Sequence, residues 1–118
     1  MEQKTILVAD DDPVVLKLLA HDLTAAGYVV IQAENGEAAV RLAKRERPDL
    51  VVLDIMMPGM DGGDAGQALK DDASTCHIPV VYLSSLVTTR VDRKGEHVLL
   101  GKPYHPADLL EVVREQAL

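Results

Sequence analysis

Four short runs of apolar, largely β-branched residues constrain the fold of this chain more than any other feature. They lie at 6–9, 29–31, 50–53 and 80–83, and a weaker run at 98–100 precedes Gly101. Each run is bounded by turn-forming or charged residues. Continuous runs of this length are typical of strands that are covered on both faces.

Between these runs, apolar residues recur at the three- and four-residue spacing of helices. In the first such segment they are Val14, Val15, Leu18, Leu19 and Leu23. Asp12 is suited to be the N-cap of this helix, Pro13 its first residue and Gly27 its end. A second helix is predicted from Asn35-Gly36 to the residues before Pro48.

A third helix is predicted at 64–70 and a final one from Pro106 through the apolar residues up to Val113. The interval 87–97 has little apolar content and is predicted to be at most a short exposed helix or a loop. Strands that alternate with helices form right-handed βαβ units. The sequence therefore predicts an α/β fold, a doubly wound parallel sheet of five strands with helices on both faces.

Length and charge restrict the function. The 118 residues fit one domain, 1–118, and the net charge of −7 disfavours direct binding to nucleic acid or to an anionic membrane. No apolar run approaches the length of a membrane span. Cys76 has no second cysteine to pair with, and no secretory leader precedes the first strand. We therefore expect a cytoplasmic protein.

Polar residues follow the predicted strands where a ligand site is expected, because an open parallel sheet binds ligands beyond the carboxyl ends of its strands. Three aspartates at 10–12 follow the first strand, Asp54 the third, Ser84 and Ser85 the fourth, and Lys102 the fifth. Carboxylates gathered there repel one another unless a cation binds. A hard divalent ion, Mg²⁺ or Mn²⁺, fits such oxygen ligands, and a phosphoryl group on Asp54 would fit between that ion and Lys102.

These residues resemble the receiver domains of two-component response regulators. The resemblance rests on four segments in order, which are Asp-Asp-Asp-Pro at 10–13, Leu-Asp-Ile-Met-Met-Pro-Gly-Met-Asp-Gly at 53–62, Ser84, and Lys-Pro-Tyr at 102–104. It implies a flavodoxin-like fold with strand order 2-1-3-4-5. It also implies a phosphoacceptor signalling domain, not a conventional enzyme, that promotes its own phosphorylation and dephosphorylation.

The resemblance assigns roles to single residues. Asp54 would accept a phosphoryl group from the phosphohistidine of a sensor histidine kinase, from a phosphotransfer protein or from a small donor such as acetyl phosphate. Lys102 would pair with the phosphoryl oxygens, and Ser84 would be the switch hydroxyl unless Ser85 takes that place. The phosphorylated domain would then act on a downstream effector protein or on a domain outside this chain.

The resemblance also implies a metal site. Asp11 and Asp54 would bind Mg²⁺ directly, Asp10 would bind it through water, and the backbone carbonyl of Met56 would complete the protein ligands. A simpler interpretation is an acidic helix start, but one N-cap accounts for one aspartate of the three.

Two departures from the family pattern concern signal output. The interval from Ser84 to Lys102 is short, so the fourth-helix region is shortened, and Leu99 stands where most members have Tyr or Phe. One alternative is therefore a pseudo-receiver, a protein-binding module that does not depend on phosphorylation. Another is a phosphatase of the haloacid dehalogenase type, but Met56 stands where that class has its second acid.

Overall fold

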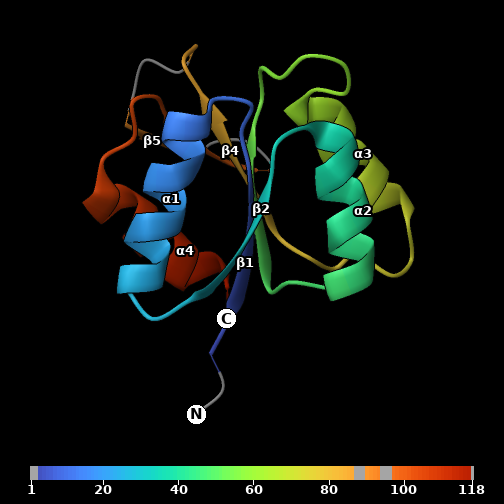
Figure 1. Cartoon of the computed structure of the whole chain (residues 1–118), viewed down its shortest axis with the longest axis horizontal. Coiled ribbons are helices and arrows are strands. Elements are labelled where there is room, and N and C mark those ends of the chain that lie inside the picture. The colour runs from blue at the N-terminus through green and yellow to red at the C-terminus, as the bar shows by residue number, and fades with distance from the viewer. Residues whose placement is uncertain (1–2, 87–89, 94–96, 118) are drawn as a thin grey trace.

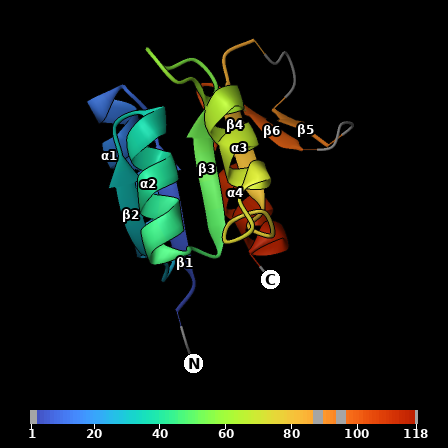
Figure 2. The same ribbon diagram turned by 90° about the vertical axis from the view of Figure 1, so that its right-hand side faces the viewer.

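The five long strands pair in parallel and form the centre of the molecule. In the computed structural model, which describes residues 3–86, 90–93 and 97–117, they are β1 (Thr5–Ala9), β2 (Val29–Ala33), β3 (Leu50–Asp54), β4 (Val80–Ser84) and β6 (Val98–Gly101). The sheet order is β2-β1-β3-β4-β6-β5. The predicted α/β fold is confirmed, as is the order of the five parallel strands (Figure 2).

Four helices cover the two faces of this sheet. They are α1 (Pro13–Ala25), α2 (Gly36–Glu46), α3 (Gly62–Asp71) and α4 (Pro106–Gln116). Figure 1 shows α1 and α4 on one face and α2 and α3 on the other. Each helix among the described residues is too short or too polar to span a lipid bilayer.

Alternate residues of each strand supply the two cores. In β1, Ile6 and Val8 join the core under α1 and α4, whereas Leu7 and Ala9 join the core under α2 and α3. All four side chains are fully buried. Because β1 and β3 are apolar on both faces, they are stable only in the middle of the sheet, and this places their carboxyl ends next to each other.

The expectation that every long strand is covered on both faces was wrong, and α1 is only partly covered. The edge strand β2 is not covered on both faces, because Val29 is exposed and Val30 and Ile31 are only partly buried. On α1 the buried side chains include Leu16, Leu19 and Leu23, whereas Val14 and Leu18 are exposed. The apolar stripe of α1 is therefore wider than the surface that the sheet covers.

The segment between β4 and β6 also differs from its prediction. Val91–Asp92 forms β5, a two-residue strand that pairs antiparallel with β6 at the edge of the sheet. The prediction of a loop or short helix over 87–97 is therefore wrong at 91–92. Residues 87–89 and 94–96 lie outside the described residues. The described residues between β4 and β6 contain no helix, in keeping with the predicted shortening.

Candidate functional site

The first part of the site follows β1, where Asp10 is buried and Asp11 is exposed. The Asp10 amide donates to the carbonyl of Ala33 at 3.2 Å. The Asp10 Oδ1 atom accepts from the amide of Asp12 at 2.9 Å, and Asp12 in turn caps α1 by accepting from the amide of Val14. The predicted cap is therefore confirmed, and it leaves the other two aspartates at the end of the strand.

The second part of the site follows β3. Asp54 ends this strand and is 3% exposed, and its Oδ1 atom accepts from the amide of Met56 at 3.3 Å. Burial, and next the charge of Asp10, raise the pKa of Asp54 above its ordinary value, against the lowering effects of Lys102 and the Met56 amide. The side chain of Met56 is exposed, so it is the Met56 backbone that contacts Asp54.

Lys102 joins the two parts. Its ammonium lies 2.9 Å from Asp10 Oδ2 and 3.2 Å from Asp54 Oδ2. Burial lowers the pKa of Lys102, but the hydrogen bonds and charges of the two aspartates outweigh this effect and the net direction is upward. The ammonium therefore lies against both carboxylates.

Ser84 is held close to Lys102 by the backbone. It is 2% exposed at the end of β4, and its carbonyl accepts from the amide of Lys102 at 3.0 Å. Its hydroxyl oxygen accepts from the amide of Leu86 at 3.1 Å, which leaves the hydroxyl proton available to a further acceptor. Ser85 is exposed. Of the two serines, the buried one is thus fixed at this edge of the sheet.

Divalent metal fits the residues that are present. Ligand atoms of Asp10, Asp11 and Asp54 all lie within 4.8 Å of one another. Asp10 Oδ2 is buried, and among the described residues it has no hydrogen-bond donor besides the nearby Lys102 ammonium. Three carboxylates face one ammonium, so negative charge remains in excess, and oxygen ligands of this kind suit Mg²⁺.

Gly62 is a residue whose part in the site the sequence did not reveal, since the third helix was predicted to begin at residue 64. Asp61 is instead the N-cap of α3, and Gly62 is its first residue. A Cβ atom at Gly62 would overlap the backbone carbonyl of Asp54, and the Gly62 amide donates to the carbonyl of Ile55 at 2.9 Å. A glycine directly after a helix cap is the signal that could have indicated such a close approach.

Comparison with known proteins gives a consistent result. A sequence model described as "Response regulator receiver domain" matches residues 6–114. The response regulator PleD of Caulobacter vibrioides is 44% identical over 93 residues, which are 79% of this chain but 19% of PleD. Protein PilH of Pseudomonas aeruginosa is 38% identical over 112 residues, covering 92% of this chain and 93% of PilH. The chain thus spans about a fifth of one relative and nearly all of another.

Solved structures agree with this. Chemotaxis protein CheY4 of Vibrio cholerae superimposes with a TM-score of 0.87 at 26% identity, covering 98% of this chain and 99% of that one. The receiver domain of a sensor histidine kinase of Pseudomonas aeruginosa, solved with a magnesium ion in its active site cleft, gives a TM-score of 0.86 at 25% identity, with 98% of each chain covered.

Proposed function

The chain belongs to the response regulator receiver domain family, and from this premise we propose that it accepts a phosphoryl group on Asp54 in a Mg²⁺-dependent reaction. The observation that carries the proposal is the position of the Lys102 ammonium between Asp10 and Asp54, with Asp11 beside them. We further propose that residues 1–118 act as one domain, because both cores share a single sheet.

Asp54 is suited to be the nucleophile. One of its carboxylate oxygens would attack the phosphorus of a phosphohistidine or of acetyl phosphate, so that a new O–P bond forms while the bond to the leaving nitrogen or acetate oxygen breaks. The departing imidazole nitrogen takes up a proton, and the product is an acyl phosphate on Asp54. The amide of Met56 keeps the carboxylate turned toward the edge of the sheet through its hydrogen bond.

Lys102 and Ser84 would hold the transferred group. The ammonium, which now pairs with two carboxylates, would pair with phosphoryl oxygens, and the free hydroxyl proton of Ser84 would be donated to one of them. Mg²⁺, or Mn²⁺ in its place, would be held by Asp11 and Asp54 directly, by Asp10 through water, and by the backbone carbonyl of Met56. The bound cation supplies positive charge that stabilises the phosphoryl oxygens during transfer.

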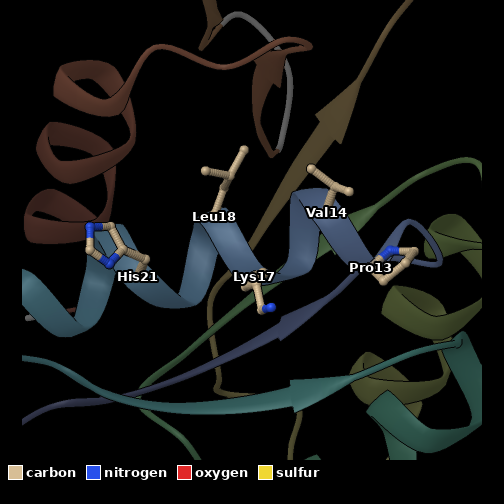
Figure 3. A pocket seen from close by; sticks show the side chains of 5 residues that line it. All are labelled: Pro13, Val14, Lys17, Leu18 and His21. Carbon is tan, nitrogen blue, oxygen red and sulfur yellow. The ribbon is translucent and has the colours of Figure 1, made fainter.

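The exposed part of α1 is where we place the phosphodonor. Receiver domains interact with histidine kinases or phosphotransfer proteins and with effectors. Val14 and Leu18 are 65% and 50% exposed, and they line a surface pocket of about 440 Å³ with Pro13, Lys17 and His21. Figure 3 shows Val14 and Leu18 on one side of α1, away from Lys17. Because α1 begins directly after the aspartates, a partner on this face reaches Asp54.

A pseudo-receiver is the second candidate, and one observation favours it. Among the described residues, β5 takes the place between β4 and β6 where a helix is expected in this family, and Leu99 is not aromatic. Under this alternative the site binds Mg²⁺ while phosphorylation changes nothing in the binding surface.

The proposed function is tested by intact mass after incubation with acetyl phosphate, with Mg²⁺ or with a chelator. We expect a gain of one phosphoryl group that requires Mg²⁺ and is lost in Asp54→Ala. A folded protein that binds Mg²⁺ and gains no mass from either acetyl phosphate or a phosphorylated histidine donor would instead support the pseudo-receiver.

A further inference from the structure

A hydrogen bond joins the loop after β6 to α1, next to the candidate site. The hydroxyl of Tyr104 donates to Asp22 Oδ2 at 2.7 Å, and the two residues are 82 positions apart in the sequence. Both side chains are partly buried, and the ring of Tyr104 packs on the core under α1 and α4. Burial, and next the hydrogen bond to Asp22, raise the pKa of Tyr104, so its hydroxyl keeps its proton at neutral pH.

This bond lies close to Lys102 along the chain. The Lys102 amide is bonded to the Ser84 carbonyl, and after it the chain leaves the sheet and enters α4 at Pro106. Pro103 and Pro106 have no N–H to donate. Between Lys102 and α4, the side chain of Tyr104 therefore supplies a hydrogen bond that joins this short loop to α1.

The outer side of the same loop borders open space. A pocket of about 240 Å³ is lined by Val15 and Leu18 of α1, by Pro103 of the loop and by Pro106, the first residue of α4; Lys102, Tyr104 and Asp22 also border it. Side chains of the described residues do not fill this space. If the link between Tyr104 and Asp22 were removed, the loop would have room to shift within this space beside α1, and the Lys102 side chain would move with it.

We infer that Tyr104 and Asp22 are positioning residues, whose hydrogen bond keeps the Lys102 ammonium between Asp10 and Asp54. The inference rests on the proposed function in so far as Lys102 assists phosphoryl transfer to Asp54. It adds that the position of Lys102 is coupled to α1. This helix carries Asp22 near its end and has Val14 and Leu18 on its exposed surface.

The first test removes either the donor or the acceptor of the hydrogen bond between Tyr104 and Asp22. Tyr104→Phe keeps the ring and deletes the hydroxyl, and we expect the maximal rate of phosphorylation by acetyl phosphate in Mg²⁺ to fall roughly fivefold, the size expected for loss of one hydrogen bond. Asp22→Ala should have the same effect, whereas Asp22→Asn, which retains an acceptor oxygen, should keep most of the rate. Tyr28→Phe, which deletes the hydroxyl of another tyrosine packed on the same core, should leave it unchanged.

Two further comparisons separate positioning from a general structural role. The double variant Tyr104→Phe/Asp22→Ala should be no slower than either single variant. In a Lys102→Ala background, Tyr104→Phe should cause no further loss. A wild-type rate in Tyr104→Phe, or an equal loss in the Lys102→Ala background, would overturn the inference.

Hydrogen exchange tests the link without any phosphodonor. We expect the amide of Lys102 to exchange several-fold faster in Tyr104→Phe than in the wild type, with the amides of β1 unchanged. Unchanged exchange at Lys102 would contradict the inference even if the protein is phosphorylated. Faster exchange in a protein that acetyl phosphate does not modify would contradict the proposed function and leave the link standing.

Discussion

The loops after β1 and β3 and the segment between β4 and β6 are held in place in different ways. Asp10 and Asp54 end fully buried central strands and are fixed by backbone amides and by Lys102. The segment containing β5 has two paired residues at the sheet edge, and its Arg90 and Arg93 side chains form ion pairs with Asp108 and Glu115 of α4 in partial exposure to solvent.

This difference in how the two regions are held indicates which region carries the chemistry and which one can vary. A site built on central strands keeps its geometry because moving it would open the core. A segment held by exposed ion pairs and a short edge strand can change with little loss of stability. Phosphoryl acceptance should therefore depend strongly on the loops after β1 and β3, the first region, and weakly on the segment containing β5, the second region.

The largest effect should come from Lys102→Ala. Removing a charged group that stabilises developing negative charge typically slows a reaction about 100-fold or more, and we expect a loss of that size in the rate of phosphorylation by acetyl phosphate. Lys4→Ala, which removes an exposed lysine before β1, is the matched control and should react at the wild-type rate. A Lys102→Ala rate close to that of the wild type would mean that the ammonium only neutralises the aspartates.

Gly62→Ala should disturb the backbone at Asp54 in the first region. The new Cβ would overlap the Asp54 carbonyl, and we expect a loss of about 1–3 kcal/mol in the free energy of unfolding, measured with denaturant. In the control Gly63→Ala the nearest atom, Asp61 Oδ1, would lie at 3.4 Å, and helix propensity favours alanine. Equal stability of the two variants would show that the loop moves freely and does not fix Asp54.

Asp54→Asn should make the protein more stable while abolishing phosphorylation. Because the pKa of Asp54 is raised in the folded state, its contribution to stability is present below the unfolded value of 3.8 and is lost as pH rises through the folded pKa. Without divalent cations at neutral pH, we expect Asp54→Asn to melt a few degrees higher, each kcal/mol being worth about 4 °C.

Two controls accompany this melting experiment. The difference between Asp54→Asn and the wild type should shrink as the pH falls through the raised pKa of Asp54, where the carboxyl of the wild type becomes protonated. Mg²⁺ should raise the melting temperature of the wild type more than that of the variant. A variant that melts lower than the wild type at neutral pH would show that the ion pair with Lys102 outweighs the cost of burial.

The smallest effect should follow changes in the second region. Replacing Arg90 and Arg93 together by alanine should leave the phosphorylation rate within about twofold, since exposed pairs contribute little, and should lower the melting temperature less than Gly62→Ala does. Added salt should reduce even this difference. A large loss of rate would mean that the segment containing β5 takes part in the chemistry, and would contradict its weak role in phosphoryl acceptance.

Much of this arrangement could be predicted from sequence, because the apolar runs place polar residues at strand ends. Asp10, Asp54 and Lys102 follow such runs directly, so their convergence depends only on strand order. The link between Asp22 and Tyr104 could not be predicted, since it depends on how a helix and a distant loop pack. The exposure of Val14 and Leu18 could not be predicted either, because helical spacing does not show how much of a helix the sheet covers.

The central claim is that buried Asp54, and not its exposed neighbour Asp11, carries the phosphoryl group. The direct test is to treat the wild-type protein with acetyl phosphate and Mg²⁺, reduce the acyl phosphate with borohydride to homoserine, and locate the change by peptide mass spectrometry. We expect homoserine at position 54 alone. Homoserine at position 10 or 11, or a phosphoryl group that resists reduction and lies on a hydroxyl residue, would contradict it.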